Sequence, residues 1–95
     1  MHAAVLTFQG TPEQLEHDTQ VGQRLLPIMR EQAGFQGYYR LQDREGGKSL
    51  IITFWESEAA LHAAREDSAQ IRYEIDRDLG HDAPLVQIYE VLEHF

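Results

Sequence analysis

The sequence contains no cysteine, so disulfide bonds, thiol chemistry and cysteine-ligated metal sites are excluded. Basic residues are also scarce, because 8 lysines and arginines stand against 16 aspartates and glutamates and the formal net charge is −8. A surface of this charge repels phosphate backbones, so we expect no nucleic-acid partner. No apolar run approaches the roughly 18 residues that a membrane-spanning helix needs, and the N-terminal residues lack the basic start of a signal peptide. We therefore expect a soluble, cytoplasmic protein with no membrane partner.

The sequence also lacks the motifs that hold phosphate groups, nucleophiles or metal ions. There is no glycine-rich phosphate loop and no nucleophile elbow. Glu13 and His17 have a spacing that suits a metal, but two ligands on a surface helix are too few for a site. We expect neither a metal nor an organic cofactor.

The stretch from Ser49 to Ser57 organises the rest of the chain. Along a strand, Leu50, Ile52 and Phe54 point to one face and Ile51, Thr53 and Trp55 to the other. Both sets are mostly apolar, so the strand should be covered on both sides. Helices of the same chain cover one face of a small sheet, and a second subunit is the economical cover for the other. The pattern therefore predicts a homodimer.

Turn and cap signals divide the 95 residues, which we expect to form one domain over 1–95, into six elements. Thr11 reads as an N-cap, Pro12 as the first helical residue and Gln14 as a capping-box partner. We predict strands over 3–9, 35–42, 49–55 and 85–95. A first helix is predicted from 12 to about 32 or 33, with a stop at Gly34. A second helix is predicted over 58–79, with a stop at Gly80 and a possible break at 67–68. This order is βαββαβ, the α+β, ferredoxin-like antiparallel sheet with helices on one face.

Two segments carry a family resemblance: Gly34-Phe35-Gln36-Gly37 at the start of the second strand, and Thr53-Phe54-Trp55-Glu56-Ser57-Glu58-Ala59-Ala60-Leu61 after the hairpin. Together they resemble the antibiotic biosynthesis monooxygenase superfamily, most clearly over residues 3–61. The resemblance implies a dimeric α+β barrel, in which two sheets pack face to face and each subunit has a cleft between its sheet and helices.

The resemblance also implies a site. In the cofactor-free, quinone-forming members the tryptophan of this motif lines the cleft, assisted by an asparagine four residues before it and a tyrosine six residues after it. Trp55 matches the tryptophan, whereas the other two positions hold Ile51 and Leu61. Trp55 is therefore the candidate catalytic residue, and the candidate substrate-binding residues are Tyr38, Tyr39, Ile51, Thr53 and Leu61. A structural interpretation of Trp55, as a large side chain that closes the end of the barrel, stays open.

The residues that the haem-degrading branch needs are missing here. The position of that branch's haem-ligating histidine corresponds to about Glu74 in this sequence, and the position of its second tryptophan to about Ala64. Haem is therefore not expected. His62 follows Leu61 by one residue, about 100° round the helix, and we expect it to be exposed.

Two functions remain. The first is a small cofactor-independent monooxygenase that acts on an aromatic or polyketide-like molecule. The second is a non-catalytic dimeric barrel that binds a small hydrophobic ligand, which the apolar residues at Ile51 and Leu61 favour.

Overall fold

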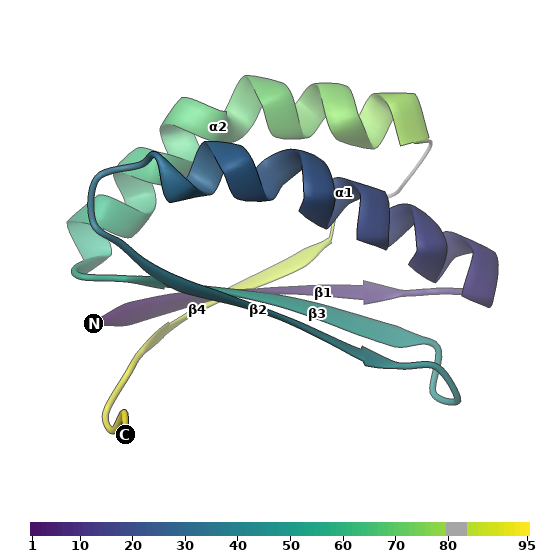
Figure 1. The fold of residues 1–95 in the computed structure, drawn as a ribbon, viewed down its shortest axis with the longest axis horizontal. Coiled ribbons are helices and arrows are strands. Elements are labelled where there is room, and N and C mark those ends of the chain that lie inside the picture. The colour runs from purple at the N-terminus through teal and green to yellow at the C-terminus, as the bar shows by residue number, and fades with distance from the viewer. Residues whose placement is uncertain (80–83) are drawn as a thin grey trace.

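The order of strands and helices is the one that the sequence predicts. The computed structural model describes residues 1–79 and 84–95, except for the side chains of residues 17, 18, 21, 75, 76, 78 and 79. Its elements are β1 (His2–Gln9), α1 (Pro12–Arg30), β2 (Phe35–Asp43), β3 (Lys48–Trp55), α2 (Glu58–Leu79) and β4 (Leu85–Glu90). The four strands form an antiparallel sheet in the order β2-β3-β1-β4, and both helices lie over one face of it (Figure 1). The α+β, ferredoxin-like arrangement is confirmed.

No helix among the described residues is long and apolar enough to cross a membrane.

Strand β3 lies between β1 and β2 and shows the predicted alternation. Ile51, Thr53 and Trp55 are buried beneath the helices, together with Ser49, whereas Leu50, Ile52 and Phe54 are only half-buried on the opposite face. In the neighbouring strand β1, Ala4, Leu6 and Phe8 are buried on the helix side. The core of the chain therefore sits between the sheet and the two helices.

The face of the sheet away from the helices is rich in apolar side chains that this single chain leaves uncovered. Ile52 lies at its centre and pairs with Val5 of β1 and with Tyr39 of β2. Larger side chains toward the sheet edges are strongly exposed: Tyr39 61%, Leu41 47%, Leu85 60% and Tyr89 49%. A continuous apolar face of this kind is unusual on a monomer.

The N-terminus of α1 is capped as predicted, but the helix ends earlier than predicted. The Thr11 hydroxyl accepts a hydrogen bond from the Gln14 N–H at 3.3 Å, and the Gln14 side chain accepts one from the Thr11 N–H at 2.8 Å. The helix ends at Arg30 rather than near residue 32 or 33, because the N–H groups of Glu31 and Gln32 bond to carbonyls three residues back and tighten the last turn.

Gly34 reverses the chain from this turn into β2. Its φ is +85°, a conformation that glycine adopts without a steric penalty, and its carbonyl accepts a hydrogen bond from the Glu56 N–H at 2.8 Å. A Cβ at this position would lie 2.6 Å from the Cβ of Ala60. The start of β2 is thus tied to the end of β3 and to the first turn of α2.

Helix α2 runs from Glu58 to Leu79 without the break that we allowed at 67–68. Ser68 is fully buried, and its hydroxyl donates to the carbonyl of Ala64, one turn earlier, at 2.8 Å. The serine therefore bonds within the existing helix rather than capping a new one. The start of α2 is capped as expected, because the Ala60 N–H donates to the Ser57 hydroxyl at 3.1 Å. The predicted stop at Gly80 lies outside the described residues.

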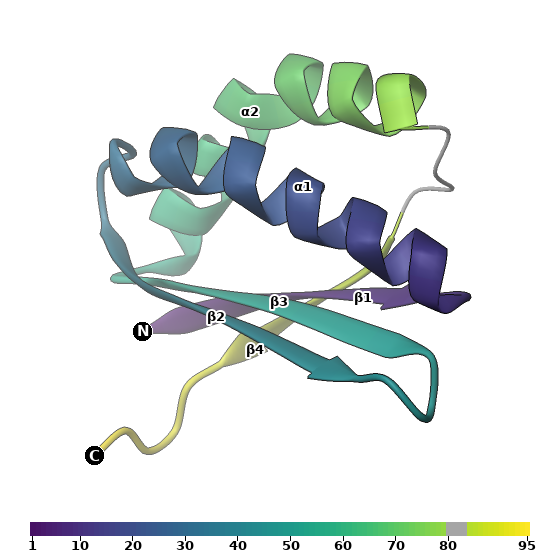
Figure 2. The same ribbon diagram turned by 45° about the vertical axis from the view of Figure 1, so that its right-hand side comes forward.

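Strand β4 is shorter than predicted, since it ends at Glu90 and not at Phe95. Its partner β1 begins at His2, and one further bond, from the Val91 N–H to the Met1 carbonyl, closes the ladder at 2.9 Å. The described pairing between β1 and β4 ends with this bond. The last residues continue on the side of the sheet opposite the helices (Figure 2), where the His94 ring lies 6.4 Å from the Phe54 ring and Leu92 and Phe95 are strongly exposed.

Candidate functional site

A small cavity of about 30 Å³ lies between the sheet and both helices. Of the ten described residues that line it, seven are buried, and the three that reach solvent are Tyr38 of β2 and Arg65 and Arg72 of α2. The buried residues are Ala4, Leu6, Leu25, Met29, Ile51, Thr53 and Trp55. The cavity thus has an apolar floor and a rim of hydrogen-bond donors, which is the usual construction of a small-molecule site.

Trp55 forms part of the buried floor and is 1% exposed. Its Nε1–H donates to the Thr53 hydroxyl oxygen at 2.9 Å, and the Phe35 ring stands edge-on to the indole at a centroid distance of 5.6 Å. Thr53 and Trp55 are two positions apart on one strand and so share a face. The polar end of the indole is therefore satisfied by a neighbour, while its ring faces the cavity.

Tyr38 supplies a phenol at the rim. Its hydroxyl points toward α1 at Gly22, where an added Cβ would lie 2.6 Å from the hydroxyl oxygen. Burial raises the pKa of Tyr38, and the opposing effect of the nearby Arg40 guanidinium is smaller. Tyr38 is therefore a hydrogen-bond donor at neutral pH.

The two rim arginines, Arg65 and Arg72, lie two turns apart on α2. The Arg72 side chain donates from Nε to the Ser68 hydroxyl at 3.2 Å and from a terminal nitrogen to the Arg65 carbonyl at 2.6 Å. Burial lowers the pKa of Arg65, and the positive charge of Arg72 lowers it further. Arg65 remains cationic at neutral pH, because a guanidinium is effectively always protonated in proteins.

Sequence reasoning did not select these arginines, although a signal was present. Positions 61, 65, 68 and 72 recur at helical spacing, so Arg65 and Arg72 lie on the same stripe of α2 as the buried Leu61 and Ser68. A charged residue within an apolar stripe is a better site candidate than one on a solvated face.

Four of the six residues predicted for the site line this one cavity: Tyr38, Ile51, Thr53 and Trp55. Leu61 is fully buried in the same core cluster but is not part of the cavity wall. Tyr39 lies on the opposite face of the sheet, where it stands edge-on to Phe54 at 5.9 Å and borders a separate hollow of about 270 Å³.

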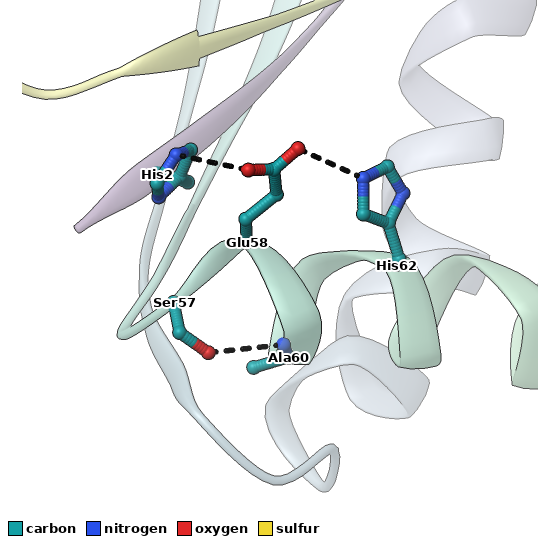
Figure 3. A network of polar contacts seen from close by, with 5 residues as sticks. All are labelled: His2, Ser57, Glu58, Ala60 and His62. Carbon is teal, nitrogen blue, oxygen red and sulfur yellow. Dashed lines mark hydrogen bonds and ion pairs between the residues drawn. The ribbon is translucent and has the colours of Figure 1, made fainter.

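A polar network at the start of α2 lies apart from the cavity. The Glu58 carboxylate stands between two imidazoles, 3.7 Å from His2 and 3.4 Å from His62 (Figure 3). His62 is exposed, as predicted. Within the part of the chain that the structure describes, no group of three or more His, Cys, Asp or Glu side chains is placed to hold a metal ion. The side chain of His17, which the sequence pairs with Glu13, lies outside the described residues.

The model of one protein family, antibiotic biosynthesis monooxygenase, matches residues 1–73 of the sequence. The chain belongs to this family. The resemblance in the Gly34–Gly37 and Thr53–Leu61 segments is thereby confirmed. Comparison with curated proteins finds no matching sequence.

Three solved structures have a fold similar to that of this chain. SnoaB, a cofactor-independent oxygenase from Streptomyces nogalater, has a TM-score of 0.77 at 16% identity, covering 98% of this chain and 94% of SnoaB. The ActVA-Orf6 monooxygenase of Streptomyces coelicolor, in complex with nanaomycin D, has a TM-score of 0.76 at 21% identity, covering 99% and 89%. Rv0793 from Mycobacterium tuberculosis has a TM-score of 0.75 at 16% identity, covering 98% and 96%. At these identities the likeness concerns the fold alone.

Proposed function

We propose that this chain is a cofactor-independent monooxygenase that oxidises an aromatic or polyketide-like molecule in the cavity beneath its two helices. The observation that carries the proposal is the cavity itself, where a buried indole ring and aliphatic side chains meet a rim of phenol and guanidinium donors. Family membership supports the reaction class. SnoaB is a cofactor-independent oxygenase and the ActVA-Orf6 enzyme binds nanaomycin D, which supports the ligand class.

The residues that line the cavity suit a substrate that activates oxygen by itself. An electron-rich phenol or anthrone passes electron density to O₂ once it is deprotonated, so the protein has to bind it, exclude water and stabilise negative charge on oxygen. Apolar walls provide a low dielectric, in which the Tyr38 hydroxyl and a guanidinium stabilise such charge strongly. For a methylene carbon oxidised to a carbonyl, one atom of O₂ enters the product and the other leaves as water.

The cavity has to enlarge to admit such a molecule. About 30 Å³ is room for one water molecule, whereas ligand sites usually measure roughly 300–1,000 Å³. The seven floor residues are buried in the core, and among the described lining residues Tyr38, Arg65 and Arg72 are those that border solvent. We propose that these three side chains move apart on binding.

The proposal includes a homodimer formed through the uncovered sheet face and a cytoplasmic location. Ile52 and Phe54 on one central strand and Val5 on the next supply the centre of an apolar surface that a second copy would cover. The resemblance to dimeric barrels supports the same assembly.

A second candidate is a barrel that binds a small hydrophobic ligand without oxidising it. One observation favours it: Ile51, at the position where the quinone-forming members carry asparagine, is 3% exposed and lies in the cavity wall. The wall therefore lacks one polar group that those members use.

The fluorescence of Trp55 tests binding, because this residue is the only tryptophan in the chain. We expect anthrone, 1-naphthol or a simple quinol to quench it at micromolar concentration, and oxygen uptake to follow with at least one compound that binds. Tyr38→Phe, which removes one donor and keeps the ring, is the matched variant. Quenching without oxygen uptake across the panel would favour the binding module, and neither effect with any compound would exclude both functions for this cavity.

A further inference from the structure

Helix α1 carries a glycine in its interior, where the helix lies over the sheet. Gly22 is buried, and its backbone does not have the positive φ that would require a glycine. Because glycine is a poor helix former, its presence at this point calls for a reason in packing. Leu25 and Met29, which line the cavity, follow Gly22 at helical spacing and share its face of the helix.

The space that a side chain would take at Gly22 is occupied by the Tyr38 hydroxyl. A Cβ built on Gly22 would lie 2.6 Å from that oxygen. Its next neighbours, the Cδ of Arg40 and the Cδ1 of Ile51, would lie at the ordinary contact distances of 3.5 and 3.8 Å. Since Tyr38 and Ile51 both line the cavity, the hydroxyl lies at the end of the cavity that borders α1.

A polar contact holds β2 against the same part of α1. Tyr38 and Arg40 are two positions apart on β2 and therefore share a face. The Arg40 guanidinium donates a hydrogen bond to the hydroxyl of Thr19, one turn before Gly22. The Thr19 hydroxyl in turn donates to the Leu15 carbonyl at 3.4 Å. The strand that carries the phenol is thereby held next to Gly22.

The Tyr38 hydroxyl is free to bind a ligand. Within the described part of the chain, no protein group forms a hydrogen bond with it. Since burial raises the pKa of Tyr38, the hydroxyl is protonated and can donate. A donor beside an apolar cavity favours a ligand that presents an acceptor oxygen, because such a donor is costly to leave unpaired.

We propose that Gly22 is a positioning residue, whose missing side chain seats the Tyr38 hydroxyl where it donates to an acceptor oxygen of the bound ligand. The phenol ring can lie against α1, so the hydroxyl stays in the cavity wall while the rim opens. Gly22 acts on the ligand only through Tyr38. The inference rests on the proposed function, because it assigns a role at the same cavity.

Ligand affinity tests whether the hydroxyl is placed by Gly22. 1-Tetralone and tetralin share one bicyclic skeleton and differ by a carbonyl group, and isothermal titration calorimetry measures both affinities. A neutral hydrogen bond changes a binding constant roughly two- to tenfold, so we expect wild type to prefer 1-tetralone by that factor. Tyr38→Phe and Gly22→Ala should each bring the ratio close to one. Gln23→Ala, an exposed neighbour on α1, should keep the wild-type ratio.

Turnover of anthrone and stability separate positioning from a purely structural role. To reach ordinary contact with a Cβ at position 22, the Tyr38 oxygen has to retreat from 2.6 to 3.4 Å. Because a misplacement of about 1 Å can cost about a hundredfold in rate, Gly22→Ala should lower kcat by roughly tenfold to a hundredfold. In Tyr38→Phe, which already lacks the oxygen, the same change should not lower kcat further. There it should raise the folding equilibrium constant about fivefold, since alanine is the better helix former.

The outcomes distinguish this inference from the proposed function. Equal affinity of wild type for the two bicycles would overturn the inference, and so would a Gly22→Ala variant with the wild-type ratio and kcat. Either result leaves the oxygenase proposal standing. If wild type binds neither bicycle and neither binds nor oxidises anthrone, both proposals fail.

The double variant Gly22→Ala with Tyr38→Phe gives the sharpest result. If Gly22→Ala lowers kcat as much in the Tyr38→Phe background as in wild type, Gly22 does not act through the hydroxyl and the inference is wrong. Should Gly22→Ala alone fail to fold, the double variant is still expected to fold, because it lacks the clashing oxygen. A double variant that also fails to fold would contradict the inference.

Discussion

Replacing Ile52 by glutamate is expected to convert the proposed dimer into a monomer. Ile52 lies at the centre of the sheet face opposite the helices, between Val5 and Tyr39. In a face-to-face dimer its side chain would be buried against the second copy. A carboxylate there would lose its hydration without gaining a partner. This desolvation cost exceeds the net free energy of association that a typical interface provides.

Light scattering would measure the change directly. Wild type should have twice the chain mass of 11.0 kDa at micromolar concentration, and Ile52→Glu should have 11.0 kDa or lose its cooperative unfolding transition. Ala63→Glu adds the same charge at an exposed position of α2 and should remain a dimer. A monomeric wild type, or an Ile52→Glu variant that still dimerises, would contradict the face-to-face barrel.

The second large effect concerns the indole at the floor of the cavity. Trp55→Phe should lower the free energy of unfolding by about 2–4 kcal/mol, because it leaves a void in the core and deprives the Thr53 hydroxyl of its donor. Thr53→Val keeps the volume and should cost about 1–3 kcal/mol, since it leaves the buried indole N–H unsatisfied. Chemical denaturation followed by circular dichroism measures both.

Turnover by the folded fraction then separates the two roles of Trp55. Since the indole N–H is held by Thr53, we expect folded Trp55→Phe to keep most of its oxygen uptake and Tyr38→Phe to lose more. A Trp55→Phe variant of wild-type stability without turnover would instead make the indole N–H a donor to the reacting oxygen, as the sequence motif suggests.

The parts of the fold that the sequence predicts well are those set by local chemistry. The alternation along β3 needs only the geometry of a strand, and the Thr11 and Gln14 cap needs only neighbours within one turn. Opposite placement of Tyr38 and Tyr39 follows from the same alternation. Which of the two tyrosines faces the helices depends on how β2 pairs with β3, and the sequence does not determine that pairing.

The parts that escaped prediction depend on contacts between distant segments. The end of β4 is decided by where β1 begins, so the apolar residues from Val91 onward carried no signal of a stop. Ser68 reads as a helix cap until its hydroxyl is seen to bond within α2. The helical spacing of Arg65 and Arg72 places them on one stripe, but their position at the cavity rim depends on how α2 lies over the sheet.

The origin of the inserted oxygen is the most direct test of the proposed chemistry. Protein treated with a metal chelator would be supplied with anthrone under ¹⁸O₂, and the anthraquinone product analysed by mass spectrometry against a protein-free control. The account predicts oxidation well above the control, one ¹⁸O atom in each product molecule, and a slower reaction with Tyr38→Phe. If a compound that quenches Trp55 is oxidised no faster than in the control, or yields product without the label, the chain is not a cofactor-independent monooxygenase acting at this cavity.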